Sequence, residues 1–229
     1  MKHIDKQLHE ITTLKWLPWI GNQYTSIPKK HRLFIIGESH YHDKSAKSIE
    51  RHNIQTFTRE VIEDMAIGRN YYNTKIFQNI HKTLFGNDKF NSENFWNLVS
   101  FSNIIQRPME TNNGRPTYND YYLGWLTFFE TLKFIKPSSC IFVGVGASNS
   151  LKKAISNSTY SLKSFVKEEK ISTTYPRKAI ISTPNGDKIN LIFIQHVSKY
   201  FSCSKWNIYL QKSMNNELTW LQENSKKLI

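Results

Sequence analysis

Two short apolar runs, residues 33–36 and 140–143, each end at a glycine, and they restrict the fold more than any other feature. A run in which four consecutive residues are all apolar is typical of a parallel strand buried on both faces. The stretch 97–106 predicts another strand, and helical patterns lie between the strands. This alternation predicts an α/β fold of three layers, α/β/α, with a mostly parallel central sheet.

The rest of the chain adds a hairpin and the helices. The runs 178–182 and 188–195 flank Pro184-Asn185-Gly186-Asp187, in which Asn-Gly favours the positive φ angles of a tight turn. The polar stretch 156–172 is expected to be a mobile insertion. Apolar spacing predicts helices at 4–14, 56–67, 73–85, 118–135, 147–155 and 206–228, the first ending before Pro18. With no linker or repeat, residues 1–229 are expected to form a single domain.

The charge balance indicates a polyanionic partner. The sequence has 31 Lys and Arg against 18 Asp and Glu, a formal net charge of +13. Such an excess is typical of proteins that bind nucleic acid or an anionic membrane, although solubility alone is a simpler explanation. The apolar runs fall well short of the roughly 18 residues of a membrane helix, so we expect no membrane partner.

Cysteine use indicates the compartment. Only Cys140 and Cys203 are present, too few for a disulfide framework, a four-ligand zinc site or an iron–sulfur cluster. The first residues have mixed charge and lack the apolar segment of a signal peptide. We therefore expect a cytoplasmic monomer with no metal or other cofactor.

Polar residues follow each predicted strand at its carboxyl end. Residues 38–43 follow the first strand, 103–107 lie around the end of the second, and 196–201 follow the last. Because ligands of α/β sheets bind at the carboxyl ends of the strands, we expect these segments to converge on one crevice. They contribute a carboxylate, an amide and an imidazole from Glu38, Asn103 and His196.

This ordered set resembles the uracil-DNA glycosylase superfamily. The first family motif, Gly-Gln-Asp-Pro-Tyr-His or Gly-Glu-Ala-Pro-Gly, stands here as Gly37-Glu38-Ser39-His40-Tyr41-His42. The stretch Phe101-Ser102-Asn103-Ile104-Ile105-Gln106-Arg107-Pro108, followed by Arg115-Pro116-Thr117, is similar to the thermophilic iron–sulfur branch. The third motif, His-Pro-Ser, stands as His196-Val197-Ser198. The resemblance spans about residues 30 to 210 and implies a uracil-DNA glycosylase-like fold.

The resemblance implies a DNA glycosylase that hydrolyses the N-glycosidic bond of a flipped pyrimidine and leaves an abasic site. The base is uracil or a modified cytosine of phage DNA, the latter implying antiviral defence. Glu38 would assist attack at the sugar, and His196 would stabilise the departing base. Asn103 would read the polar edge of the base, while Tyr41 and Phe57 would offer faces for stacking.

DNA is the partner that the resemblance implies, and loop residues would hold its backbone. Cations and polar groups bind phosphates, and apolar side chains wedge into a base stack that has lost a base. The candidates for DNA contact are Ser39, Arg107, Arg115, Ser198, Lys199, Tyr200 and Phe201.

The sequence also departs from the family motifs. Ser39 replaces the aspartate of the first motif, so the carboxylate would be Glu38. His40 and Val197 replace the two family prolines, and the cysteines of the iron–sulfur branch are absent. In the family the motif tyrosine excludes a methyl group at pyrimidine C5. Without the prolines we expect a loop free to move Tyr41 aside and admit a bulky C5 substituent.

Other functions stay open. Glu38, His40, His42 and Asp43 crowd one loop with metal-ligating groups, as in a metal-dependent nuclease or phosphoesterase. A non-catalytic DNA-binding protein on the same fold is another alternative. Simpler roles also exist: Glu38 as a helix cap, His196 as a core histidine and the aromatic residues as packing.

Overall fold

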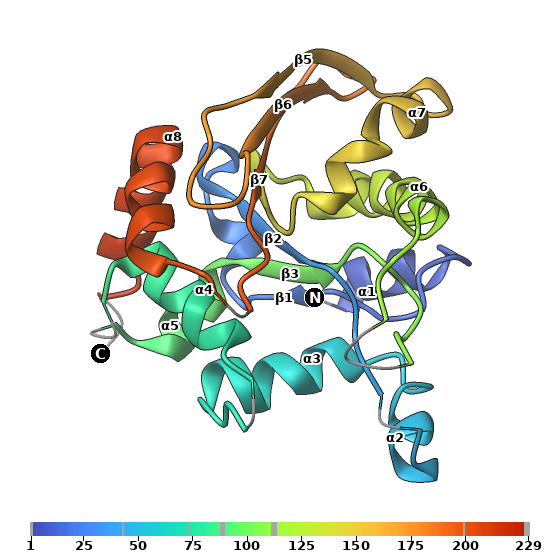
Figure 1. The fold of residues 1–229 in the computed structure, drawn as a ribbon. Helices are drawn as coiled ribbons and strands as arrows, with labels where there is room; N and C mark the ends of the chain where they lie inside the picture. The colour runs from blue at the N-terminus through green and yellow to red at the C-terminus, as the bar shows by residue number, and fades with distance from the viewer. Residues whose placement is uncertain are drawn as a thin grey trace.

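The computed structural model describes residues 2–42, 44–72, 74–87, 90–110, 114–198 and 200–226. Its centre is a seven-stranded mixed sheet with the order β1-β3-β2-β4-β7-β6-β5 (Figure 1). The inner strands β3, β2, β4 and β7 are parallel, and β1, β6 and β5 are antiparallel at the two sides. The strands are β1 (Trp19–Ile20), β2 (Leu33–Gly37), β3 (Ser100–Asn103), β4 (Ser139–Val143), β5 (Ser161–Lys167), β6 (Arg177–Ser182) and β7 (Lys188–Ile194). The predicted α/β class with a mostly parallel central sheet is confirmed.

Helices cover both faces of the sheet (Figure 1). One face carries α1 (Lys2–His9), α6 (Tyr118–Ile135), the short 3-10 helix Gly146–Asn149 and α7 (Leu151–Ser156). The other carries α3 (Phe57–Val61), its π-helical continuation Ile62–Ile67, α4 (Ile76–Phe85), α5 (Ser92–Leu98) and α8 (Cys203–Asn224). The short helix α2 (Ala46–Arg51) extends away from the sheet, and 3-10 turns span Tyr24–Ser26 and Lys29–His31.

Strand β2 shows why the sheet is buried on both faces. Phe34 and Ile36 pack in the core beneath α6, whereas Leu33 and Ile35 pack in the core beneath α8. Side chains of a strand alternate between the two faces, so a fully apolar run needs a helical layer on each side. The structure thus agrees with the prediction that this strand is buried on both faces.

Three predicted elements differ in the structure. The segment 97–106 is not one strand, because α5 extends to Leu98 after Asn91 caps it by accepting from the Asn94 amide. The predicted first helix ends at His9. The mobile insertion at 156–172 is wrong: this segment contains β5, which pairs with β6. An edge strand has an exposed border, so it tolerates the polar residues that suggested a loop.

The strand order identifies the place at the carboxyl edge of the sheet where a ligand crevice is expected. From β2 the chain crosses to β3 on one side and later to β4 on the other, which makes the carboxyl ends of β2 and β4 a topological switch point. Ligand crevices of open α/β sheets lie at such points. Within the described ranges, no helix is long and apolar enough to cross a membrane.

Candidate active site

The switch point brings together the carboxylate and the imidazole that the sequence singled out. Glu38 follows β2, Gly144 follows β4, and His196 comes two residues after β7. A β-carbon placed on Gly144 would lie 3.6 Å from Oε2 of Glu38 and 3.9 Å from Cδ2 of His196. Glu38 and His196 therefore face each other across a glycine that leaves space between them.

Two tyrosines hold the Glu38 carboxylate. Tyr121, in the first turns of α6, donates a hydrogen bond of 2.6 Å to Oε2, and Tyr41 donates one of 3.3 Å to Oε1. Burial and the nearby carboxylate raise the pKa of both tyrosines, so each phenol keeps its proton and remains a donor. Both carboxylate oxygens are thereby fixed in direction.

His196 presents one ring nitrogen to the site. Its Nδ1 lies 2.9 Å from the Ser198 hydroxyl, and in the described part of the chain Nε2 has no hydrogen-bond partner. Burial lowers the pKa of His196; Glu38 opposes this shift, and Arg115 adds to it. When the Ser198 hydroxyl donates to Nδ1, the ring proton lies on Nε2, which becomes a neutral donor toward a ligand.

Asn103 ends β3 next to Gly37 of β2. The two residues are paired in the parallel ladder, and a β-carbon on Gly37 would lie only 2.2 Å from Asn103 Oδ1. Asn103 is 7% exposed as a residue, and no described residue is hydrogen-bonded to its side-chain amide, whose atoms are not among the buried unpartnered ones. An amide that can both donate and accept, and that other side chains leave open, is suited to the polar edge of a ligand.

The loop after β2 is fixed by backbone hydrogen bonds. Met109 N–H donates to the His40 carbonyl at 2.8 Å, and His42 N–H donates to the Met109 carbonyl at 3.1 Å, which makes a β-bridge at Tyr41. The Ser39 hydroxyl adds a bond of 2.6 Å to the Arg107 carbonyl. These bonds hold the backbone on both sides of Tyr41, and whether the loop moves Tyr41 aside stays a prediction.

A separate aromatic cluster lies beneath this loop and contains Phe57. Its ring centroid is 4.7 Å from that of His40 and 4.4 Å from that of His52, and Trp16 packs edge-on against His40 at 4.8 Å. Phe57 is 7% exposed, and its ring contacts are with this cluster and not with Glu38. The structure therefore does not bring Phe57 into the candidate site.

The predicted DNA contacts on the β3 side occupy an exposed rim. Arg107 forms a two-pronged ion pair with Asp120, at 2.6 and 2.7 Å, and about half of its side chain is exposed. Arg115 is exposed and acts electrostatically on Tyr41 and His196, so it lies beside the site. Arg107 is held by a carboxylate, whereas Arg115 faces the candidate site.

The predicted contacts after β7 differ from one another. Tyr200 is 95% exposed and has a positive φ of 60°, so its ring projects from the surface. Phe201 stacks on Trp206 with centroids 6.1 Å apart. Val197 is buried, and its carbonyl accepts a 2.8 Å bond from Asn79, which anchors the loop. Lys199 lies outside the described residues.

The described ranges contain no set of ligands for the alternative of a metal-dependent enzyme. No three His, Cys, Asp or Glu side chains there gather in an arrangement that could hold an ion. His40 Nε2 pairs with Thr58 at 2.9 Å, and His42 Nδ1 accepts from the Lys44 amide. Asp43, the remaining candidate ligand, lies outside the described residues.

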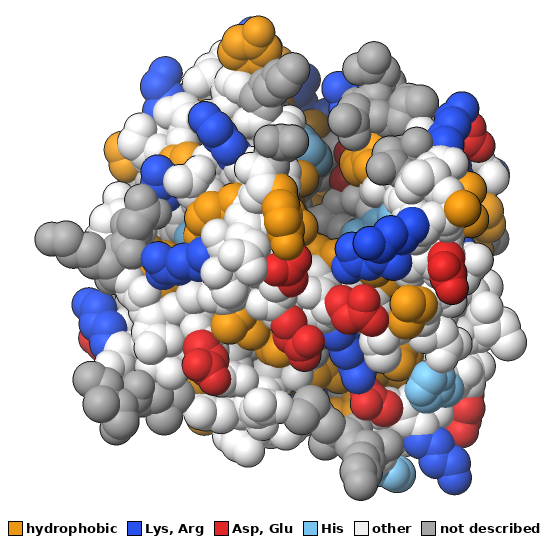
Figure 2. Space-filling view, turned by 90° about the horizontal axis from the view of Figure 1, so that it is seen from below, with side chains coloured by type: hydrophobic (Ala, Val, Ile, Leu, Met, Phe, Trp, Pro, Cys, Tyr) orange, Lys and Arg blue, Asp and Glu red, His pale blue; other side chains and the backbone are white. Residues whose placement is uncertain are grey.

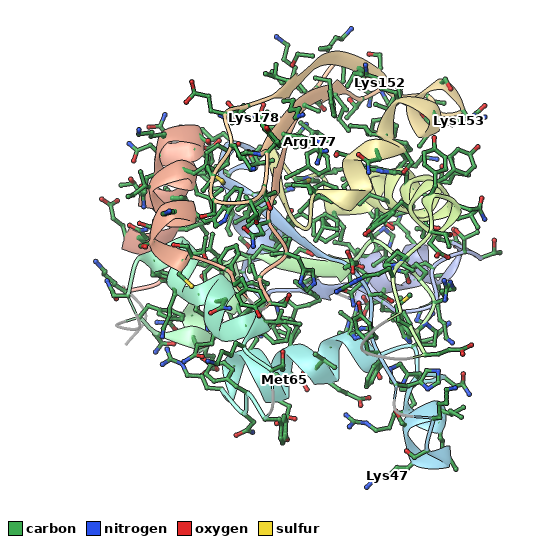
Figure 3. All side chains as sticks on the ribbon, in the orientation of Figure 1. Lys47, Met65, Lys152, Lys153, Arg177 and Lys178 are labelled. Atoms are coloured by element: carbon green, nitrogen blue, oxygen red, sulfur yellow. The ribbon has the colours of Figure 1, made fainter. Side chains whose placement is uncertain are left out.

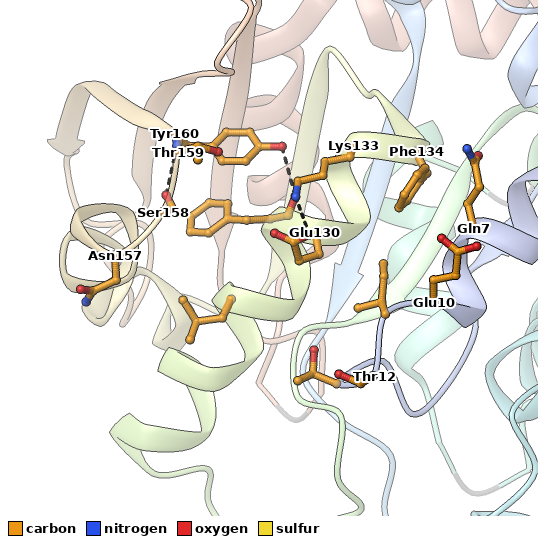
Figure 4. A pocket seen from close by; sticks show the side chains of 14 residues that line it. Gln7, Glu10, Thr12, Glu130, Lys133, Phe134, Asn157, Ser158, Thr159 and Tyr160 are labelled. Atoms are coloured by element: carbon orange, nitrogen blue, oxygen red, sulfur yellow. Dashed lines mark hydrogen bonds and ion pairs between the residues drawn. The ribbon is translucent and has the colours of Figure 1, made fainter.

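A large hollow lies on a different part of the molecule. It has a volume of about 740 Å³ and lies between the N-terminal segment, α6 and the loop after α7 (Figure 4). Glu130 in its wall pairs with Lys133 at 2.5 Å, and Tyr160 donates to the Phe129 carbonyl. The hollow contains none of the predicted site residues. Figure 2 shows the molecule from below, the side on which α2 lies in Figure 1. A second depression is visible there, with histidines inside and Lys or Arg at its rim.

Sequence reasoning missed three residues of the site: Tyr121, Gly144 and Met109. Tyr121 lies in an amphipathic helix, where a tyrosine indicates packing, and Met109 acts through its backbone. Gly144 ends an apolar run and was noted only as a strand terminus. A second glycine at a strand end was the one available signal, because such glycines mark close approach of neighbouring groups.

No family model matches the sequence, and no curated protein matches it significantly.

Proposed function

We propose that the protein is a DNA glycosylase on a uracil-DNA glycosylase-like fold. The observation that carries the proposal is that Glu38 and His196 meet across Gly144, while Asn103 ends the adjacent strand β3 beside Gly37. These are the residue types and the chain order of the three motifs. The excess of 31 basic over 18 acidic residues supports DNA as the partner.

The chemistry assigned to each residue follows from its surroundings. As the C1′–N bond of the nucleotide breaks, the sugar becomes oxocarbenium-like and the base leaves with the bonding electrons. The Glu38 carboxylate, oriented by Tyr121 and Tyr41, stabilises the positive sugar and orients the water whose oxygen bonds to C1′. The proton that this water loses passes to the base anion, which is released as the neutral base. His196 donates from Nε2 to the anionic base, as a preorganised donor does in an oxyanion hole. Asn103 binds the polar edge of the base.

Uracil is the base that the loop geometry favours. The Tyr41–Met109 bridge and the hydrogen bond to Glu38 restrain the tyrosine that, by resemblance, lies against pyrimidine C5. A restrained ring in that position excludes bulky C5 groups, since overlap with a packed side chain is costly. This favours uracil repair over attack on modified phage cytosines.

The test is base release from a panel of duplexes. The duplexes carry uracil, thymine, 5-hydroxymethylcytosine or glucosylated 5-hydroxymethylcytosine, and alkaline cleavage reports abasic sites. We expect release of uracil alone, undiminished in EDTA, and release of thymine by Tyr41→Ala. The absence of abasic product from all four duplexes, with folded protein that binds DNA, would support the non-catalytic alternative. Activity lost in EDTA would support the metal-dependent one.

A further inference from the structure

Arg177 lies at the same edge of the sheet as the candidate site, although it is far away in the sequence. It begins β6 and pairs in register with Phe193 near the carboxyl end of β7 and with Lys167 at the end of β5. Its guanidinium donates to the carbonyl of Val145, the residue after Gly144, at 3.3 Å. Figure 3 labels Arg177 at the start of β6, beside Lys178. Arg177 thus reaches the loop that separates Glu38 from His196.

The positive charge of Arg177 has no carboxylate partner among the described residues. The guanidinium is partly buried, and this burial lowers the pKa of Arg177. Its neighbour Lys178 differs, because Glu168 lies 3.0 Å from the ammonium. Removing a cation from water without a counter-ion is unfavourable, so a half-buried unpaired arginine beside a crevice is suited to an anionic ligand.

Two lysines extend this cationic surface along the edge. Lys167 and Lys170 both lie over the ring of Tyr175, with their ammonium groups 3.9 and 5.7 Å from its centroid. Tyr175 is exposed, and the ring holds the two charges side by side. Glu168 is occupied by Lys178 and by Tyr209, which leaves Glu169 as the exposed carboxylate of this segment.

We propose that Arg177 binds a backbone phosphate of DNA, with Lys167 and Lys170 continuing the contact outward. The proposal rests on the proposed function and adds a second side to its DNA interface. Arg115 follows β3 and Arg177 begins β6, so cations flank Glu38 and His196 on both sides. Three strand spacings separate β2 from β6, a distance of about 14 Å. About four base pairs of a DNA duplex cover the same distance along the helix axis. Arginine suits this contact because its planar fork binds phosphate with two hydrogen bonds.

The experiment measures how binding to a nonspecific duplex depends on salt. We expect Arg177→Ala to reduce the slope of log K against log salt by about 0.9, the value for one lost phosphate contact. Arg177→Lys keeps the charge and should keep most of the slope. The control is Lys188→Ala, which removes an exposed charge at the amino end of β7, the opposite edge of the sheet, and should leave the slope unchanged.

The outcomes separate this inference from the proposed function. If the wild type releases uracil and Arg177→Ala has the same salt slope as the wild type, the Arg177 contact is overturned and the proposed function is kept. Equal slope changes in Arg177→Ala and Lys188→Ala also overturn it, since they indicate a diffuse charge effect. A reduced slope specific to Arg177→Ala supports the contact even when no base is released, because binding is measured without catalysis. Thermal melts of each variant identify any that fail to fold.

Discussion

At the scale of single residues, the arrangement around Glu38 is the most informative part of the molecule. Its two oxygens accept from tyrosines that come from different segments, Tyr41 in the loop after β2 and Tyr121 in α6. A single donor leaves a carboxylate free to rotate, whereas two donors define its plane. Tyr121 touches Glu38 and not the reacting atoms, so we class it as a positioning residue.

Tyr121→Phe should therefore slow base release without weakening DNA binding. A hydrogen bond to a charged group contributes about 1.5–3 kcal/mol, so we expect the single-turnover rate to fall about 10- to 100-fold. The matched control is Tyr122→Phe, one residue along the same helix, whose hydroxyl pairs with Asn157 at 3.2 Å. Equal rates for the two variants would contradict the positioning role.

The pair across Gly144 gives a second prediction. His196→Ala should slow cleavage by about 10²- to 10³-fold, like the loss of one preorganised oxyanion donor, with little change in DNA affinity. Glu38→Gln should lower the single-turnover rate and hardly affect binding, because it keeps the shape and removes the charge. A collapsed melting temperature for Glu38→Gln, with no change in rate per folded molecule, would instead indicate a structural role.

At the scale of elements, the start of α6 connects the fold to the site. Thr117 and Asp120 form a capping box, and Asp120 also binds Arg107 from the loop after β3. These bonds lower the pKa of Asp120 to about 2, Arg107 being the largest cause. The same first turns carry Tyr121, so the cap that starts the helix also positions a donor to Glu38.

Removal of the cap should destabilise the protein measurably. Thr117→Ala should lower the free energy of unfolding by about 1 kcal/mol, the usual cost of losing a helix N-cap. Urea denaturation measures this difference, with Thr173→Ala as the control, because Thr173 is exposed in the loop between β5 and β6. An unchanged midpoint for Thr117→Ala would show that the ion pair with Arg107 holds the helix start without the cap.

Local signals in the sequence predicted these elements well, and distant pairings were not predictable. Helix 118–135 was predicted with the bounds that the structure has, because Pro137 and apolar spacing are local signals. Glu38, Asn103 and His196 were predicted because each falls where a strand ends. Segment 156–172 was misjudged, since a strand that pairs only through β6 has no strong local pattern. The bridge at Met109 involves the backbone, which leaves no signal in residue types.

At the scale of the whole molecule, histidines with a lowered pKa contribute to the response to acid, and the shifts of His40 and His81 are the largest. His40 lies in the loop after β2 and His81 lies in α4. Burial lowers the pKa of each from 6.5 to about 3. His81 Nε2 accepts from the Trp96 indole at 2.9 Å, so its ring is neutral in the folded protein. Unfolding exposes both rings, and each then takes up a proton below pH 6.5.

The sign of the pH effect follows from these depressed values. Stability is complete above about pH 6.5 and falls between about pH 6.5 and pH 3, because only the unfolded chain binds the protons there. Each of these two histidines contributes up to about 1.4 kcal/mol per pH unit. The pKa values of His31, His52 and His196 are also lowered, so these residues add to the slope in the same direction. Urea midpoints at pH 7.5, 6 and 5 measure the slope, which His40→Gln should reduce by up to about 1.4 kcal/mol per pH unit. A flat profile in wild type would contradict this account.

The turn between β6 and β7 lies at the amino edge of the sheet, opposite to the strand ends that carry the candidate site. Gly186 has a positive φ of 86° with nothing within 4 Å of a β-carbon placed on it, and Asn185 is exposed. The two native cysteines are buried or half-buried. Asn185→Cys would thus offer a thiol for attachment to a solid support. A molecule anchored there stands with its strand ends, and with the proposed DNA site, toward the solution.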